Sequence, residues 1–269
     1  MKIQGKTALV TGASRGIGRA IALELANHGI RRIILVARNQ THLADVASEI
    51  KAMGVEGIVL PLDLTQTIDV NIAIANTWKH YGPIHLLVNC AGVAHQAPFL
   101  QTKLPNVQAE LSLNLMGIYN MTHVLARRMA SKREGRIVNV SSLMGKIGAP
   151  TMATYSATKF AILGFTQALR SELSAYNIKV TALLPSLTET DMVRNTQRFR
   201  WVASMTPEKV ATVLVNSLGK ESPEILVGWQ SHLAVLGSRI APRLLEGWLH
   251  LTAPKGKPKP QSPLWSRSF

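Results

Sequence analysis

A glycine-rich loop at residues 11–18, with the sequence TGASRGIG, constrains the fold more than any other feature. It follows a short aliphatic run at residues 7–10 and precedes apolar residues that recur at helical spacing up to residue 26. A strand, a glycine turn and a helix in this order let the backbone approach a pyrophosphate, which the free N–H groups of the helix N-terminus attract. The segment therefore predicts a dinucleotide-binding turn built on Gly12, Gly16 and Gly18.

Aliphatic runs alternate with helical patterns along the rest of the chain. Besides residues 7–10, strands are expected at residues 32–37, 58–61, 84–88, 136–140, 178–184 and 224–227. Further helices are expected at residues 41–53, with Thr41 as the N-cap, and at 66–81, 104–132, 154–176 and 206–218. Parallel strands joined by helical crossovers form a sheet that is covered on both faces. The sequence predicts an α/β fold, a Rossmann-type doubly wound parallel sheet of about seven strands, in one domain at residues 1–228.

The second expected strand indicates which dinucleotide binds. About 20 residues beyond the glycines, an NAD site usually has an acid that binds the ribose 2′-hydroxyl. Residues 36–39 read VARN here, and no acid occurs between Glu24 and Asp45. Arg15 and Arg38 are suited to hold a 2′-phosphate through charge-assisted bonds, although two solvated surface arginines are the plain alternative. NADP(H) is therefore the expected cofactor.

A serine, a tyrosine and a lysine follow the strand expected at residues 136–140. Ser142 lies in a Ser/Gly/Pro-rich loop, and Tyr155 and Lys159 are four residues apart on the next expected helix. That spacing places the phenol and the ammonium on one helix face. Lys159, together with a cationic cofactor ring, is expected to lower the pKa of Tyr155 by about three units, or about 4 kcal/mol. The pattern predicts a carbonyl-reduction site.

The joint spacing of these motifs, over about residues 3–220, resembles the short-chain dehydrogenase/reductase family of the compact, single-domain type, including its 3-oxoacyl reductases. The glycine loop matches the motif of that family, and residues 89–92 (NCAG) resemble its Asn-Asn-Ala-Gly turn. Two departures are visible, because Cys90 replaces the second asparagine of that turn and Ser186 stands where glycine is usual.

The resemblance implies a catalytic tetrad and a cofactor site. The tetrad would consist of Asn114, Ser142, Tyr155 and Lys159. Tyr155 would exchange the proton, Ser142 would hydrogen-bond the same oxygen, Lys159 would bind the nicotinamide ribose, and Asn114 would hold a water. The cofactor would contact Gly12, Ser14, Arg15, Gly16, Ile17, Gly18, Arg38, Asp63, Leu64, Asn89, Ala91, Gly92, Tyr155, Lys159, Pro185, Thr188 and Thr190.

The segment at about residues 188–205 is expected to form a substrate lid. Met192, Phe199 and Trp201 would line an apolar pocket, opposite residues 93–100 and 143–144. The substrate is expected to be a small hydrophobic carbonyl or alcohol, and a 3-oxoacyl thioester, a steroid-like or other lipophilic ketone and a xenobiotic carbonyl remain alternatives. Basic residues at the end of the helix expected at 104–132 would suit an acidic acyl carrier.

The C-terminal part is apolar at residues 229–251, with an interruption at Pro242, and residues 252–269 form a basic, Pro-rich tail that is expected to be disordered. Three roles stay open for residues 229–269: a subunit interface, a lid over the pocket, or contact with a membrane surface. In each case the segment is expected to tune location or substrate access without joining the catalytic machinery.

Composition sets the remaining expectations. The single cysteine, Cys90, excludes an intramolecular disulfide and favours a reducing, cytoplasmic location, with peripheral membrane contact left open. The net charge of +15 allows acidic partners, but no nucleic-acid motif accompanies it, and no metal site is expected. A homodimer or homotetramer is expected through Ile162, Phe165 and Leu169. The alternative function is a catalytically idle dinucleotide-binding scaffold or a basic-surface binding protein.

Overall fold

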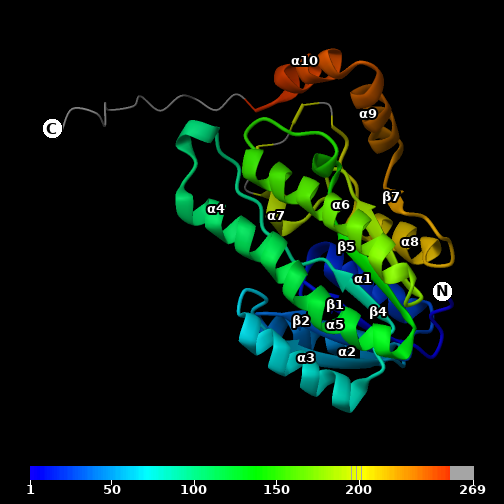
Figure 1. Ribbon diagram of the computed structural model, residues 1–269. Helices are drawn as coiled ribbons and strands as arrows, with labels where there is room; N and C mark the ends of the chain where they lie inside the picture. Colours follow the sequence, from blue (N-terminus) through cyan, green and yellow to red (C-terminus); the bar gives the residue numbers. More distant parts are fainter. Residues whose placement is uncertain (195, 198, 201, 255–269) are drawn as a thin grey trace.

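The computed structural model describes residues 1–194, 196, 197, 199, 200 and 202–254 (Figure 1). Its centre is a seven-stranded, all-parallel sheet in the order β3-β2-β1-β4-β5-β6-β7. The strands are β1 Thr7–Thr11, β2 Arg32–Ala37, β3 Glu56–Pro61, β4 Leu86–Asn89, β5 Gly135–Val140, β6 Ile178–Leu184 and β7 Glu224–Leu226. The predicted doubly wound α/β sheet is confirmed.

Two helical layers cover the sheet. One layer holds α1 (Gly16–Asn27), α2 (Gln40–Ala52) and α8 (Pro207–Ser217), which share one apolar core. The second core lies on the other face, under α3 (Thr67–Tyr81), α5 (Ile118–Lys132) and α6 (Ala153–Ser174). The central strands are buried on both faces, which explains why they read as continuous aliphatic runs without alternation.

The topology places the functional loops along one edge of the sheet. The chain winds from β1 outward to β3 and then crosses back to β4 on the other side of β1. In register, Val10 of β1 is opposite Val88 of β4, and Asn89 is opposite Asn139 of β5. The loops after β1, β4, β5 and β6 therefore leave the sheet together at the switch point, where ligands bind in folds of this kind.

Local structure corrects the sequence predictions at three places. The N-cap of α2 is Asn39, whose Oδ1 accepts from the N–H of His42 at 3.0 Å, so the prediction of Thr41 as the cap was wrong. The helix expected at 104–132 is α4 (Leu104–Leu111) and α5, joined by a π-helical turn at Ser112–Gly117. Ile162 faces the core at 1% exposure and Leu169 packs against the second core, so neither is the exposed apolar position that was expected.

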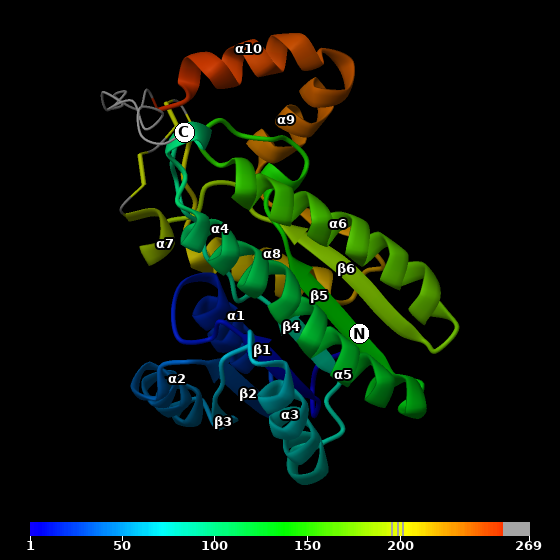
Figure 2. The same cartoon turned by 60° about the vertical axis from the view of Figure 1, so that its left-hand side comes forward.

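The remaining elements surround the carboxyl edge of the sheet. Two short 3₁₀ turns occupy Phe99–Gln101 and Leu143–Gly145, and α7 is the single turn Asp191–Arg194. After β7 the chain forms α9 (Trp229–Ile240) and α10 (Pro242–Thr252), and Pro242 in the first turn of α10 marks the break between them. Figure 2 shows both helices as an arm that projects beyond the sheet.

Within the part of the chain that the structure describes, no helix is long and apolar enough to cross a membrane. The expected disorder of the tail falls mostly on residues 255–269, which lie outside the described residues.

Candidate active site

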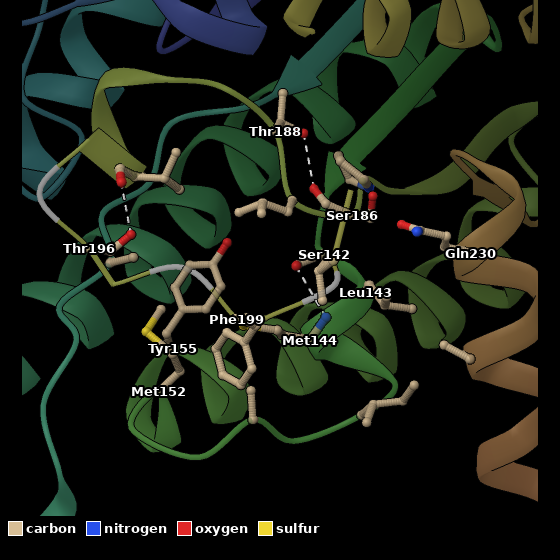
Figure 3. A pocket seen from close by; sticks show the side chains of 18 of the residues that line it. Ser142, Leu143, Met144, Met152, Tyr155, Ser186, Thr188, Thr196, Phe199 and Gln230 are labelled. Atoms are coloured by element: carbon tan, nitrogen blue, oxygen red, sulfur yellow. Dashed lines mark hydrogen bonds between the residues drawn. The ribbon is translucent and has the colours of Figure 1, made fainter. Parts of the chain in front are cut away.

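An apolar cavity of about 500 Å³ opens at the carboxyl edge of the sheet. Its walls come from the loops after β5 and β6, from α7 and the segment after it, and from α9 and α10. Figure 3 shows Ser142 and Tyr155 facing the same space, with Gln230 of α9 across from them. Two of the residues predicted to be catalytic therefore lie on the wall of this cavity.

Ser142 and Tyr155 are positioned by the loop and helix that follow β5. Ser142 is the N-cap of the 3₁₀ turn Leu143–Gly145, and its Oγ accepts from the N–H of Met144 at 3.1 Å. Tyr155 lies in the first turn of α6, with its ring half-buried against the cavity. The side chain of Ser142 acts to lower the pKa of the phenol. The two hydroxyls are thus placed to contact one ligand oxygen.

Lys159 lies one helical turn after Tyr155 and is buried at 5% exposure. Its Nζ is 5.4 Å from the centroid of the Tyr155 ring and donates to the carbonyl of Val140 at 3.0 Å. The Oγ of Ser141 donates to the backbone carbonyl of Lys159 at 2.8 Å, which joins α6 to the end of β5. The ammonium is therefore fixed behind the phenol and outside the cavity lining.

Burial dominates the electrostatics of this pair. It raises the pKa of Tyr155 to about 12, against an opposing hydrogen bond from Ser142, and it lowers the pKa of Lys159 to about 8. The groups of the chain alone therefore do not lower the pKa of Tyr155, and the lowering expected from Lys159 together with the cofactor ring stays a prediction. Desolvation of the phenolate is the largest cause of the raised pKa, and the negative charges of Glu110 and Cys90 act in the same direction.

Asn114 lies in the π-helical turn between α4 and α5 and is fully buried. Its Oδ1 accepts from the N–H of Val93 at 2.9 Å, and its Nδ2 donates to the carbonyl of Val93 at 2.9 Å. The same Nδ2 donates to the Oγ1 of Thr158 at 3.1 Å. Asn114 therefore joins the loop after β4 to the helix that carries Tyr155 and Lys159.

A buried acid lies one turn before Asn114. Glu110 is 1% exposed, and its Oε1 accepts from the backbone N–H of His95 and lies 3.3 Å from the His95 ring Nδ1. Burial raises the pKa of the Glu110 carboxyl. Gln96, which follows His95 in the chain, forms two hydrogen bonds with the backbone of Gln197. The loop after β4 therefore also contacts the segment after α7.

The glycine loop is tightly packed against the turn after β4. A Cβ on Gly12 would lie 2.9 Å from the Cα of Ala91, and a Cβ on Gly18 would lie 2.3 Å from the carbonyl oxygen of Gly12. Gly16 has a φ of +56° and faces Thr190. Only glycine fits these positions without movement.

Thr11 stabilises the base of the loop. Its Oγ1 accepts from the N–H groups of Cys90 and Ala91 at 3.0 and 3.1 Å. The backbone of the turn is thus fixed although Cys90 replaces an asparagine. Burial raises the pKa of the Cys90 thiol to about 12, so the thiol stays protonated.

The two arginines expected at the 2′-phosphate have different surroundings. Arg38, directly after β2, is exposed, and Arg15 is the N-cap of α1. Arg15 is 67% exposed and lies 3.7 Å from Asp191 of α7. Both guanidinium groups are near the carboxyl ends of β1 and β2, where they remain accessible to a ligand.

The other residues expected at the cofactor lie along the same edge. Oδ1 of Asp63 accepts from the N–H and Oγ1 of Thr65, and Leu64 is buried. Asn89 donates from Nδ2 to the Oγ1 of Thr122 and the Oδ1 of Asn139, which fixes its amide in the core. The rest lie in the glycine loop, the turn after β4 and the segment after β6: Ser14, Ile17, Gly92, Pro185, Thr188 and Thr190.

A model of the short chain dehydrogenase family matches residues 6–201. The chain belongs to this family. It is similar to a 3-oxoacyl-[acyl-carrier-protein] reductase of Synechocystis sp., at 37% identity over 193 residues that cover 72% of this chain and 78% of the relative. Ketoacyl reductase HetN of Nostoc sp. is 32% identical over 228 residues, which cover 84% of this chain and 79% of the relative.

The family likeness extends to solved structures. A short chain dehydrogenase from Burkholderia cenocepacia, in complex with NADP, has a TM-score of 0.81 at 27% identity and covers 93% of this chain and 99% of its own. The resemblance to short-chain dehydrogenases/reductases and the oxidoreductase class are thereby confirmed.

The pocket of this family member differs from the sequence prediction on one side. Met192, Phe199, Leu143 and Met144 line it as expected, whereas Trp201 lies outside the described residues. Of the wall expected at residues 93–100, Ala94 and Gln96 line the cavity, while Phe99 and Leu100 are exposed. Sequence reasoning did not assign the wall formed by α9 and α10, although a pocket lid was one of its three alternatives for this segment. That wall consists of Trp229, Gln230, Leu233, Ala234, Leu245, Trp248 and Leu249.

Sequence reasoning also missed Glu110 and His95. Nothing in the sequence distinguishes Glu110 from the solvated acids of a surface helix, and its burial follows from the packing of α4 against the loop after β4. Its spacing of four residues from Asn114, on the same helix face, was the one available signal.

Proposed function

We propose that this chain is an NADP(H)-dependent oxidoreductase that interconverts a carbonyl and a secondary alcohol and reduces a hydrophobic ketone or a 3-oxoacyl substrate. The observation that carries the proposal is the placement of Ser142 and Tyr155 on an apolar cavity wall, with Lys159 buried behind the phenol. An apolar cavity with a few convergent polar groups is the usual form of a small-molecule site.

In the proposed reaction, Tyr155 gives its phenolic proton to the carbonyl oxygen during reduction and takes it back during alcohol oxidation. The burial that raises the pKa of Tyr155 to about 12 keeps the phenol protonated, as the reducing direction requires. Ser142 donates a hydrogen bond to the same oxygen as negative charge develops on it. Lys159 holds the nicotinamide ribose, and Asn114 acts as a positioning residue through Val93 and Thr158. The nicotinamide supplies the hydride when the cofactor is bound.

The residues at the carboxyl edge fit a dinucleotide. The N-terminus of α1 has no side-chain cap, so its N–H groups are available to a pyrophosphate, and the glycines leave space for one. At the nicotinamide end, the buried Oγ of Ser186 has no hydrogen-bond partner among the described residues. An orphaned buried hydroxyl on the wall of the cavity suits the carboxamide of a nicotinamide.

NADP(H) is favoured over NAD(H) because Arg15 and Arg38 are exposed and no acid lies at the end of β2. The test is a fluorescence titration of wild type and Arg38→Gln with NADPH and NADH. We expect wild type to bind NADPH at least tenfold more tightly, and Arg38→Gln to lose most of that preference while its NADH affinity is unchanged. Equal binding of both cofactors by wild type would identify the arginines as ordinary surface residues.

The proposed activity is tested by following NADPH oxidation with acyl thioesters, steroids, long-chain ketones and small aryl ketones. The lining of Met144, Leu233, Leu245 and Trp248 favours the lipophilic ketones, because burial of apolar surface stabilises their complexes. Binding of NADPH without turnover of any carbonyl class would favour the alternative, a catalytically idle scaffold.

We further propose a homodimer or homotetramer. Large apolar side chains remain exposed around α4, α5 and the N-terminal part of α6, among them Leu111, Met116, Tyr119 and Phe160. Surfaces of this kind on a single chain indicate an interface, and self-complementary pairing is the commonest arrangement. Light scattering at micromolar concentration should give a dimer or larger species. A monomer would contradict this part of the proposal.

The proposed location is cytoplasmic, with peripheral contact to a membrane through residues 229–269. We also propose a substrate lid at about residues 188–205. The chain is divided into an oxidoreductase domain at residues 1–228, an apolar extension at 229–251 and a basic tail at 252–269. Removal of residues 229–269 should alter substrate access and location.

A further inference from the structure

The helices α9 and α10 each carry a stripe of exposed apolar side chains. On α9 the stripe consists of Trp229, Leu233, Leu236 and Ile240, and on α10 of Leu244, Trp248 and Leu251. The spacing of three and four residues places each set on one helix face. Their exposed fractions run from 40% for Trp248 to 78% for Leu244. Seven large apolar side chains left exposed on two consecutive helices mark an interaction site, because their burial against a partner is favourable.

The stripes continue into the cavity. Trp229, Leu233 and Trp248 line it and are at the same time 70%, 58% and 40% exposed, so they form its rim. Leu245 and Leu249 line the interior from α10. An apolar path therefore runs from the outer surface of the two helices into the space in front of Tyr155.

The charges around the stripes identify the partner. Arg239 and Arg243 flank the break between α9 and α10, and Lys255, Lys257, Lys259 and Arg267 follow in the sequence. Glu246 is the single acid in residues 229–269. Apolar side chains flanked by cations suit an anionic lipid surface, which offers apolar chains beneath negative headgroups. A second copy of this chain would bring the same positive charge to the contact.

The arm is coupled to the rest of the pocket at its far end. The backbone N–H of Arg200 donates to the carbonyl of Thr252 at 3.0 Å, which joins the segment after α7 to the end of α10. At its near end, α9 follows β7 directly, and Ser231 donates to the carbonyl of Val227 at 2.7 Å. The arm is therefore attached at both ends to segments that adjoin the cavity lining.

We propose that the stripes of α9 and α10 seat on an anionic membrane surface and turn the cavity mouth toward the lipid, so that a lipophilic ketone enters from the bilayer. The entry of a ketone from the bilayer rests on the proposed function, whereas the docking on the membrane surface does not. The stripes insert to the level of the headgroups, and the arginines contact lipid phosphates. The substrate class is then a ketone that partitions into lipid.

The docking test compares three chains: wild type, a stripe variant and a matched control. The stripe variant is Ile240→Ser/Leu244→Ser/Leu251→Ser, at positions that are 71–78% exposed and outside the cavity lining. The control is Ile68→Ser/Ile72→Ser, which removes exposed apolar side chains from α3. Sedimentation is measured with phosphatidylcholine vesicles, with and without phosphatidylserine, at low and high salt.

We expect wild type and the control to pellet with the anionic vesicles and to bind less tightly at high salt, because the cations are screened. The stripe variant should bind at least tenfold more weakly. Equal, negligible pelleting of wild type and the variant would overturn the inference. A wild-type oligomer that the stripe variant dissociates, without vesicle binding, would also overturn it and assign the stripes to a second copy of the chain.

A kinetic measurement separates this inference from the proposed function. The probes are acetophenone in solution and 2-pentadecanone held in anionic vesicles, each reduced with NADPH. The stripe variant should retain the wild-type rate with acetophenone and lose at least fivefold with the vesicle-held ketone. If neither ketone is reduced although wild type binds vesicles, the ketone substrates of the proposed function are refuted and the docking stands. If 2-pentadecanone is reduced equally by wild type and the stripe variant, entry from the bilayer is refuted.

Discussion

Replacing Lys159 by methionine should make the fold less dependent on pH while it abolishes turnover. Lys159 is buried, and its pKa is lowered from 10.5 to about 8 in the cofactor-free protein. A base with a lowered pKa binds fewer protons in the native than in the unfolded state between these two values, so stability rises with pH across that window. Below about pH 8 both states carry the proton, and the cost of burying the charge is fully present, at about 3 kcal/mol.

The measurable quantity is the change of that cost with pH. From the two pKa values, the cost in wild type falls by about 2 kcal/mol between about pH 7 and pH 9.5. Lys159→Met removes the charge at every pH and also leaves the carbonyl of Val140 without its donor, which adds a penalty of about 1–3 kcal/mol. Because this second penalty does not titrate, it cancels when two pH values are compared.

The assay is urea unfolding of the cofactor-free protein, at one protein concentration, at both pH values. The free energy of unfolding of Lys159→Met minus that of wild type should decrease by about 2 kcal/mol on going to the higher pH. Lys79→Met, at an exposed position on α3, serves as the matched control and should show no such change. A pH-independent difference for Lys159→Met would refute the reasoning that burial sets the pKa of Lys159.

Two further perturbations test the surroundings of the site. Gly18→Ala places a Cβ 2.3 Å from the carbonyl oxygen of Gly12, so the glycine loop must move. The affinity for NADPH, measured by fluorescence titration, should therefore fall at least tenfold. An affinity within twofold of wild type would contradict the packing argument. Glu110→Gln removes an acid whose pKa is raised by burial. Above the usual carboxyl pKa, the native state of wild type binds more protons than its unfolded state, so its stability falls as the pH rises. The Tm of wild type should therefore fall from pH 5 to 8 more steeply than the Tm of Glu110→Gln. Parallel Tm profiles of the two proteins would contradict a raised pKa at Glu110.

The alternating pattern of strands and helices was predictable because each element carries its own signal. The central strands are buried on both faces and read as unbroken aliphatic runs, and the glycine loop follows the first of them. Helix boundaries were less certain. Asn39 and Thr41 both have side chains that can cap a helix, and only the backbone path selects Asn39.

The site was predictable where it depends on spacing along one element and less so where it depends on packing. The four-residue spacing of Tyr155 and Lys159 guarantees their common face, but the pKa values depend on burial that the sequence does not express. The pocket wall from α9 and α10 arises from the path of the chain after β7. The burial of Glu110 was equally unpredictable, because it depends on the packing of α4 against the loop after β4.

The central claim is that Tyr155 exchanges the proton with the substrate oxygen, and Tyr155→Phe tests it most directly. The variant removes one hydroxyl from the cavity wall and leaves the ring, Lys159 and the glycine loop unchanged. With a ketone that wild type reduces, we expect kcat to fall by about 10²–10⁴-fold, which is the usual contribution of a general acid. The Kd for NADPH should stay within twofold of the wild-type value. A Tyr155→Phe variant that retains a large fraction of the wild-type kcat would contradict the account.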